Sequence, residues 1–303
     1  MRISVFITSY NQKQYLIEAI ESVLTQTLTP SQIVVVDDAS TDGSREVIAE
    51  YKSQYPELID AVFYARNQGV STTRNDGLKA ATGEYVSFLD GDDKFLPAKL
   101  EKEAKLLAQH PEARIAYSNY YRIAESGLRY GVWTEEPLPQ GNIFRQIITR
   151  EFPRSTFFQR LLVHRQTWLE AGFYDPNLPR GQDYEMSFRL AKRGPAVYCH
   201  EPLSEYRKDK DKPSRGSPPA EQFARSVYIY GKNLQLLDDL DEVERSDIKQ
   251  KIYKIMKKQA KRAAEEIRKA GRFSKDSQQA ASAYYGQALE TISSLLGFCT
   301  QPK

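Results

Sequence analysis

The stretch Glu84-Tyr85-Val86-Ser87-Phe88-Leu89-Asp90-Gly91-Asp92-Asp93 joins a short β-forming segment to three carboxylates around one glycine. Carboxylates crowded this closely repel one another and resist burial, so a hard cation such as Mg²⁺ or Mn²⁺ would offset the repulsion. These ions usually enter a site together with a substrate phosphate. Ligands of open α/β sheets bind beyond the carboxyl ends of the strands, which is where these acids lie. The stretch therefore indicates a metal-assisted site, although a solvated acidic turn would have the same sequence.

Strand and helix patterns alternate through the first third of the chain. Four segments rich in β-branched and apolar residues are typical of buried parallel strands: 3–8, 32–36, 61–64 and 84–89. Helical patterns lie between them, including one over 70–81 that Gly83 closes. This alternation predicts an α/β fold with a mostly parallel central sheet, flanked by helices.

The pattern changes after about residue 112. Strands are expected over 114–123 and 157–163, with several short strands over 195–207 and a loop over 134–141. A helix is expected from Gly181-Gln182-Asp183 onward. Residues 209–220 are charged and rich in proline, which is typical of a mobile loop. From residue 221 the chain has helical patterns, so we expect a catalytic domain over 1–220 and a C-terminal helical extension over 221–303.

Composition excludes several classes of protein. The 303 residues carry a formal net charge of only +3, which does not favour a nucleic-acid-binding protein. The two cysteines, Cys199 and Cys299, match no metal-site spacing and are compatible with a reducing compartment. The first residues form a strand pattern and not a signal peptide, and no apolar run approaches the roughly 20 residues needed to span a bilayer. We expect a cytoplasmic protein, or one attached peripherally to the inner face of the membrane.

Acidic residues recur where predicted strands end. Asp37-Asp38 follows the second strand and the acidic turn follows the fourth, so both face the same edge of a parallel sheet. Asp183 is a candidate to join them, while Arg66-Asn67 and Arg74-Asn75 would balance the charge. The alternative is that some of these acids, Asp37, Asp42 and Asp183, only cap helices. No dinucleotide-binding glycine motif, phosphate loop or nucleophile elbow is present in the sequence.

Six motifs in order carry a resemblance to family 2 inverting glycosyltransferases of the GT-A fold. They cover roughly residues 1–210: Ile7-Thr8-Ser9-Tyr10-Asn11; Val34 to Asp38 with Ser40, Asp42 and Ser44; Arg66-Asn67-Gln68-Gly69 through Arg74-Asn75 and Gly77; Leu89-Asp90-Gly91-Asp92-Asp93; Gly181-Gln182-Asp183; and Glu201-Pro202-Leu203 through Tyr206-Arg207. The resemblance implies the GT-A nucleotide-diphospho-sugar transferase fold. It also implies transfer of a sugar from a nucleotide-sugar, most readily a UDP-sugar, to an acceptor hydroxyl in polysaccharide or glycoconjugate synthesis.

The resemblance also implies roles for individual residues. Thr8 and Tyr10 would frame the nucleotide base, Asp38 would accept a hydrogen bond from uracil, and Arg74 would help to bind the base. Asp92 would ligate Mn²⁺ or Mg²⁺, and Asp90 would lie near the ribose and the metal as a second candidate ligand. Asp183 would be the general base.

Two positions depart from the family pattern. Gln182 stands where many members have a glutamate beside the base, which should not remove the base itself. Asp209 stands where many members have a histidine that completes the metal site. Aspartate is also a ligand of hard cations, so Asp209 is a third candidate ligand.

Two questions stay open at the level of sequence. One alternative to the enzyme is a catalytically silent protein that binds nucleotide or sugar. Retention of Asp38, Asp90, Asp92 and Asp183 disfavours this alternative. Another alternative is a nucleotidyltransferase, for which we would expect a basic glycine-rich loop near Thr8; the sequence has no such loop there.

Apolar and basic residues divide a predicted helix over 248–272 into two faces. That helix would either contact an anionic membrane, which suits a lipid-linked saccharide acceptor, or pack on the catalytic domain.

Overall fold

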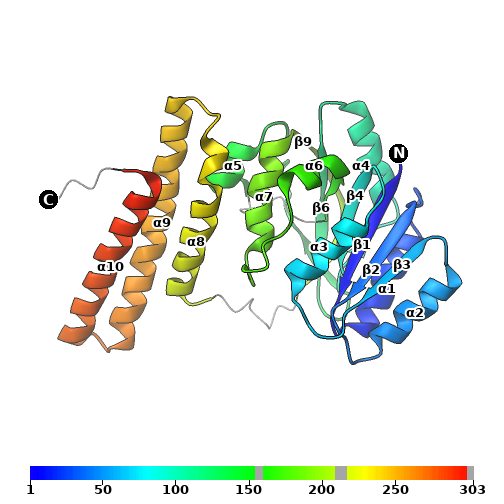
Figure 1. Ribbon diagram of the computed structural model, residues 1–303, viewed down its shortest axis with the longest axis horizontal. Helices are drawn as coiled ribbons and strands as arrows, with labels where there is room; N and C mark the ends of the chain where they lie inside the picture. Colours follow the sequence, from blue (N-terminus) through cyan, green and yellow to red (C-terminus); the bar gives the residue numbers. More distant parts are fainter. Residues whose placement is uncertain (154–159, 209–216, 299–303) are drawn as a thin grey trace. The chain divides into compact units, whose positions relative to one another are not determined.

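The computed structural model describes residues 1–153, 160–208 and 217–298 (Figure 1). These residues form two compact units. The first comprises residues 1–144 with the described part of 152–212, and the second comprises residues 145–151 with 217–298.

The first half of the larger unit is a parallel sheet, as its sequence predicts. Its strands are β1 (Ile3–Ser9), β2 (Gln32–Asp37), β3 (Ile59–Phe63) and β4 (Tyr85–Asp90), in the spatial order β3-β2-β1-β4. They are joined by α1 (Lys13–Leu24), α2 (Ser44–Gln54) and α3 (Val70–Ala80). Thr8 pairs with Val36 on one side and with Asp90 on the other, so β1, β2 and β4 end at the same level.

The second half of the sheet is mixed. Strand β8 (Leu162–His164) is antiparallel to β4 and β6 (Ile115–Ile123), which in turn pairs in parallel with β9 (Ala196–Arg207). Two short strands complete the sheet: β5 (Lys94–Phe95) pairs with β9, and β7 (Arg129–Val132) pairs with β6.

Two strand predictions in this half need correction. The short strands expected over 195–207 are one strand, because β9 follows β6 along its whole length and shifts in register absorb the irregular stretch. The strand expected over 157–163 begins only at Leu162; Arg160 has a left-handed backbone with φ of 48°, which is incompatible with extended pairing, and residues 157–159 lie outside the described residues.

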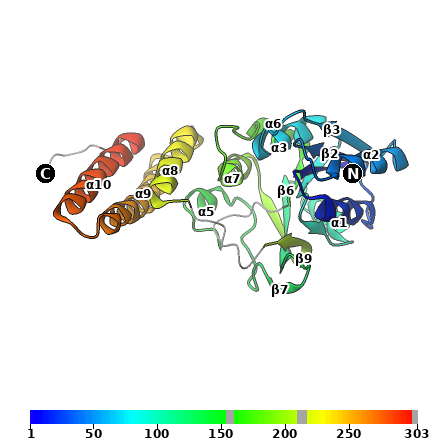
Figure 2. The ribbon, with the colours of Figure 1, turned by 90° about the horizontal axis from the view of Figure 1, so that it is seen from below.

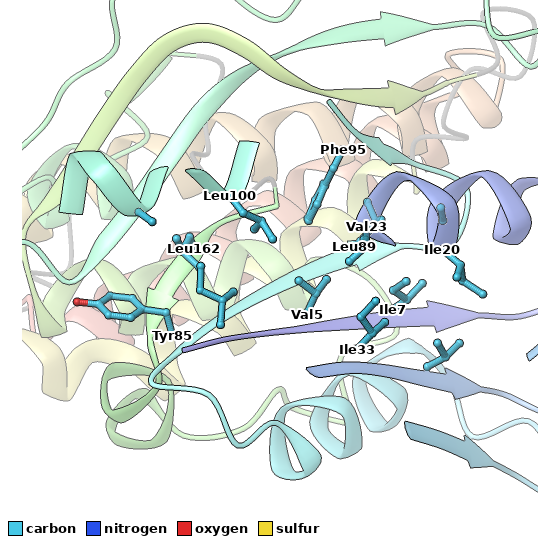
Figure 3. Close-up of a cluster of buried hydrophobic side chains, with 14 of the residues drawn as sticks. Val5, Ile7, Ile20, Val23, Ile33, Tyr85, Leu89, Phe95, Leu100 and Leu162 are labelled. Atoms are coloured by element: carbon cyan, nitrogen blue, oxygen red, sulfur yellow. The ribbon is translucent and has the colours of Figure 1, made fainter. Parts of the chain in front are cut away.

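Helices cover both faces of the sheet. On one face α1, α2 and α4 (Lys99–Gln109) bury a core of side chains from alternate strand positions, including Val5, Ile7 and Leu89 (Figure 3). On the other face lie α3 and α6 (Arg165–Ala171), and α7 (Gln182–Arg193) packs against α6. There Phe88 stacks on Phe6 at 5.9 Å between ring centroids and meets Trp168 edge-on. This packing fixes the strand ends that carry the acidic residues.

The smaller unit is helical, as expected from residue 221 onward. It contains most of α5 (Phe144–Ile148), then α8 (Pro219–Asn233), a 3-10 turn (Leu234–Leu237), α9 (Glu242–Ala270) and α10 (Lys275–Leu296). Helix α9 packs between α8 and α10, as both views show (Figures 1 and 2). Among the described residues, no helix combines the length and apolar character that a membrane span requires. Of the loop predicted over 209–220, residues 209–216 lie outside the described residues, and Pro219 already begins α8.

Candidate functional site

A cavity of about 390 Å³ lies at the carboxyl ends of β1, β2 and β4. Six residues singled out from the sequence line it together: Thr8, Tyr10, Asp38, Arg74, Asp90 and Asp92. The other lining residues are Ser9, Gln12, Asn67, Gly69, Val70, Thr73 and Gly91. The structure therefore brings together, at one edge of the sheet, residues that lie up to 84 positions apart in the chain.

The N-terminal part of helix α3 lines the cavity. Val70, Thr73 and Arg74 share the helix face that lines the cavity, whereas sequence reasoning selected only Arg74. Residues spaced three and four apart lie on one side of a helix, so this spacing could have identified Val70 and Thr73. Asn75 faces elsewhere: its side chain donates to the carbonyl of Tyr174 and accepts from its N–H.

Arg74 is buried and holds Asp90. Its Nη2 donates to both carboxylate oxygens of Asp90, at 2.8 and 3.0 Å, and its guanidinium lies 5.3 Å from the ring centre of Phe88. Burial opposes ionisation of Asp90, but the charge and hydrogen bonds of Arg74 outweigh it and lower the pKa of Asp90. Nε and Nη1 of Arg74 are buried and have no hydrogen-bond partner among the described residues. Two buried donors at the wall of a cavity suit a polar or anionic ligand.

Asp38 follows β2 directly and fastens the loop that precedes α3. One carboxylate oxygen accepts from the backbone N–H of Gln68 at 2.6 Å, and the other from that of Gly69 at 2.9 Å. A carboxylate oxygen can accept a second hydrogen bond, so Asp38 can hold the loop and still accept from a ligand. Tyr10 also lines the cavity and is 48% exposed, which leaves its ring available for stacking.

The three carboxylates of the acidic turn have different partners. Asp90 pairs with Arg74, and the fully buried Asp93 pairs with Arg160 and accepts from the backbone N–H of Arg207 at 2.8 Å. In the described part of the chain Asp92 has no ion-pair partner. Burial, reinforced by the charge of Asp90, raises the pKa of Asp92 to about 6.

This donor set fits a hard divalent cation. Mg²⁺ and Mn²⁺ are commonly bound by one or two carboxylates together with substrate phosphates and water. Asp90 and Asp92 line the same cavity, and among the described residues Asp92 has no ion pair. Among the described residues no group of three His, Cys, Asp or Glu side chains could hold a metal by itself, and Asp209 lies outside these residues.

Asp183 lies in the first turn of α7 and does not line the cavity. Burial alone would lower the pKa of Arg74, but the charge of Asp90, with smaller effects from Tyr174 and Asp183, raises it. Asp183 is therefore near enough to act electrostatically on the cavity wall. The capping alternative would place Asp183 at the N-cap of α7, but Gly181 occupies that position. Among the described residues, the side chain of Asp183 accepts from the N–H of Tyr184 at 2.7 Å.

Three other acidic residues, Glu185, Asp37 and Asp42, form hydrogen bonds within the protein. Glu185 is fully buried and accepts two hydrogen bonds from Arg189, at 2.9 and 2.6 Å. Asp37 accepts from the N–H of Ser40, and Asp42 accepts from the N–H groups of Lys13 and Ser44. Asp42 therefore satisfies N–H groups at the first residues of α1 and α2, which is close to the capping alternative, whereas the contact of Asp37 lies within the turn after β2 and not at the start of a helix.

Comparisons with known proteins agree with this geometry. The model of the family described as "Glycosyl transferase family 2" matches residues 4–170. The putative teichuronic acid biosynthesis glycosyltransferase TuaG of Bacillus subtilis is 30% identical over 206 residues, which are 68% of this chain and 78% of TuaG. An uncharacterised glycosyltransferase of Nostoc sp. is 51% identical over 102 residues, but the match spans only 34% of this chain and 31% of that protein.

Solved structures share the fold. S. aureus TarS superposes with a TM-score of 0.68 and 16% identity, covering 97% of this chain and 55% of TarS. TarS 1–349 in complex with UDP-GlcNAc gives a TM-score of 0.65 at 17% identity, covering 97% of this chain and 84% of that one. The mannosyltransferase PcManGT of Pyrobaculum calidifontis, in complex with GDP-mannose and Mn²⁺, gives 0.58 at 18% identity, with coverage of 97% and 85%.

The family model matches more than half of the chain, and TuaG is 30% identical over 68% of it. The chain belongs to glycosyl transferase family 2 and has the GT-A fold.

Proposed function

We propose that this glycosyltransferase moves a sugar from a UDP-sugar to an acceptor hydroxyl with inversion at the anomeric carbon. The observation that carries the proposal is the cavity that Tyr10, Asp38, Arg74, Asp90 and Asp92 line together; the charge of Asp183 contributes to raising the pKa of Arg74. The complexes of TarS with UDP and UDP-GlcNAc support a UDP-sugar donor. The name of TuaG supports a role in polysaccharide or glycoconjugate synthesis, with a saccharide or lipid-linked saccharide as acceptor.

Each residue of the cavity has a separate role in binding the nucleotide-sugar. The half-exposed ring of Tyr10 stacks on the base, while Asp38 accepts from a base N–H and Thr8 borders the same space. Nε and Nη1 of Arg74, which have no hydrogen-bond partner in the described part of the chain, donate to polar groups of the nucleotide. This arrangement orients the anomeric carbon by fixing the nucleotide end of the donor.

Asp92, with Asp90 as a second ligand, would hold Mn²⁺ or Mg²⁺. When bound, the ion supplies Lewis-acid stabilisation of the leaving diphosphate. The raised pKa of Asp92 reflects burial and the nearby charge of Asp90, both of which a divalent cation would offset. The Mn²⁺ complex of PcManGT supports such an ion, and Asp209 stays a predicted third ligand.

Asp183 is the proposed general base. It lies in the first turn of α7, where the positive end of the helix dipole interacts favourably with a negative charge. An ionised carboxylate takes the proton of the acceptor hydroxyl as that oxygen attacks the anomeric carbon. The C–O bond to the diphosphate breaks in the same displacement, which inverts the anomeric centre.

Two variants separate chemistry from binding. In Asp183→Asn we expect UDP and Mn²⁺ affinities close to wild type while kcat falls by about two orders of magnitude or more. In Asp92→Asn we expect metal-dependent UDP affinity and turnover to be lost together, because a charged ligand is removed. Calorimetry with a panel of nucleotide-sugars, with Mn²⁺ or with a chelator, measures binding. Proton NMR of the first product compares its anomeric configuration with that of the donor.

The silent-protein alternative predicts a different pattern. A wild-type protein that binds UDP-sugars tightly but transfers sugar to no saccharide acceptor would support it. Near-normal turnover of Asp183→Asn would exclude Asp183 as the base. A product that retains the anomeric configuration of the donor would exclude single displacement.

We also propose an electrostatic membrane contact through the basic face of α9, defined as Lys254, Lys257, Lys258 and Lys261. All four side chains are exposed, and no acidic residue lies between 248 and 264. The apolar face of α9, with Ile248, Ile252 and Met256, is buried within the helical unit, so the contact rests on charge and not on insertion of that face. Such a contact would bring a lipid-linked acceptor to the enzyme.

Co-sedimentation with vesicles tests this contact. Vesicles containing about 30% phosphatidylserine should bind the protein at low salt and release it at high salt, since each basic residue contributes about 1 kcal/mol near an anionic surface. Reversal of the four lysines to glutamate should abolish binding without lowering turnover on a soluble acceptor. Equal binding to neutral vesicles would contradict the electrostatic account.

A further inference from the structure

Arg207, the last residue of β9, lies directly behind the acidic turn. Its side chain is only 4% exposed, and its Nε donates to the main-chain carbonyl of Asp92 at 2.9 Å. The backbone N–H of Arg207 donates to the carboxylate of Asp93 at 2.8 Å. One residue therefore contacts two consecutive positions of the turn, including the one that carries the proposed metal ligand.

The remaining nitrogens of Arg207 are anchored in other parts of the unit. Nη2 donates to the carboxylate of Glu18 on α1 at 2.8 Å, and Nη1 donates to the carbonyl of Glu125 at 2.8 Å. The guanidinium also lies 4.2 Å from the ring centre of Tyr15. The planar fork of arginine allows these bonds to form together, and a lysine ammonium at the end of a flexible chain does not reproduce them.

A second arginine, Arg160, contacts the same acidic turn through Asp93. Arg160 is buried, pairs with the carboxylate of Asp93, and its Nε donates to the side chain of Ser204 at 3.0 Å. The other end of the turn is fixed by the N–H of Gly91, which donates to the carbonyl of Thr8 at 2.9 Å. The main chain on both sides of Asp92, a residue that lines the cavity, is thus held.

We propose that Arg207 is a positioning residue that holds Asp92 in the geometry required for binding the divalent cation. The inference rests on the proposed function, because it needs the metal site at Asp92. Groups that orient a metal ligand typically change metal affinity by about 10–100-fold when they are altered. The polar contacts of Arg207 with the described residues do not reach Tyr10 or Asp38, so binding of the nucleotide without metal should depend on it little.

Arg207→Lys tests the inference and has a matched control. In the presence of UDP, the Mn²⁺ affinity measured from the free-Mn²⁺ EPR signal should fall about tenfold or more. UDP affinity in excess chelator should stay within about twofold, and turnover should recover at high Mn²⁺ concentration. Arg129→Lys is the control. Arg129, on β7, pairs at 2.6 Å with Glu205, which lies on β9 as Arg207 does; Arg129 is 48% exposed and makes no polar contact with the acidic turn in the described part of the chain.

The outcomes are distinguishable. Equal Mn²⁺ affinity in Arg207→Lys and wild type overturns the inference alone, as does an equal loss of UDP affinity with and without Mn²⁺. A wild-type protein that does not bind Mn²⁺ with UDP overturns the metal part of the proposed function and the inference with it. Should Arg207→Lys fail to fold, Glu18→Gln takes its place, because it removes the charge that anchors Nη2 of Arg207. The same charge also pairs with Lys94 at 3.2 Å, so Lys94→Met is measured beside it, and a fall in Mn²⁺ affinity in Glu18→Gln but not in Lys94→Met is expected.

Discussion

Asp38→Asn should lower both the stability of the larger unit and its affinity for UDP. The substitution keeps the shape of the side chain but replaces one acceptor oxygen by an NH₂ group. That group then faces a backbone N–H, either that of Gln68 or that of Gly69, which are bound at 2.6 and 2.9 Å in the native protein. The remaining hydrogen bond changes from one with a charged acceptor to one with a neutral acceptor.

The magnitude follows from these two losses. A hydrogen bond to a charged group contributes about 1.5–3 kcal/mol and a neutral one about 0.5–1.5 kcal/mol, so the surviving bond weakens by about 1 kcal/mol. Leaving the other N–H unpaired costs about 1–3 kcal/mol. Gln68 is exposed, so water satisfies part of that demand and the lower end of the range applies. We therefore expect the free energy of unfolding to fall by about 2 kcal/mol.

Tryptophan fluorescence measures this change in the larger unit alone. The chain has two tryptophans, Trp133 and Trp168, and both are buried in that unit. Urea unfolding of Asp38→Asn is compared with Asp60→Asn, in which an exposed aspartate loses a surface pair with Lys52 and stability should change by less than about 1 kcal/mol. If the two variants unfold at the same urea concentration, the contacts of Asp38 do not stabilise the loop as we argue.

Two further predictions use the same unfolding assay. In Gly91→Ala the new Cβ would lie 2.7 Å from the carbonyl oxygen of Thr8, so we expect the free energy of unfolding to fall by about 1–3 kcal/mol. Calorimetry should also show weaker metal-dependent UDP binding, and unchanged values for both would show that the turn can move aside. Lys99 and Glu103 form a fully buried ion pair. Because Lys99→Met leaves the charge of Glu103 buried without its partner, we expect the free energy of unfolding to fall by about 3–5 kcal/mol, and the double variant Lys99→Met/Glu103→Leu should recover most of that loss. A double variant less stable than the single one would contradict this account.

The part of the fold that positions the site could be predicted from local sequence. Buried parallel strands are continuous apolar runs, and in β1, β2 and β4 these runs stop where polar residues begin. Since the carboxyl ends of parallel strands share one edge, Thr8, Asp38 and Asp90 could be placed together without knowledge of the strand order. Their common cavity agrees with that placement.

The second half of the sheet was less accessible to the same reasoning. The continuity of β9 depends on its pairing with β6, about 80 residues earlier, and on register shifts that absorb the stretch around Pro202. Short apolar runs give no information about distant partners, so one long strand was predicted as several short ones. The same limit applies to β8, whose start follows the left-handed backbone of Arg160.

The distribution of charge around the acidic turn shows why the site itself needed the structure. Three carboxylates within four residues are evident in the sequence, but the arginines that balance two of them lie 16 and 67 positions away, at Arg74 and Arg160. Only their placement reveals that Asp90 and Asp93 have cationic partners and that Asp92 has no ion pair in the described part of the chain. Because a carboxylate without an ion pair at a cavity wall gains most from a cation, this arrangement gives a physical reason for the proposal that Asp92 is the principal metal ligand. The family motif alone gave the same choice without that reason.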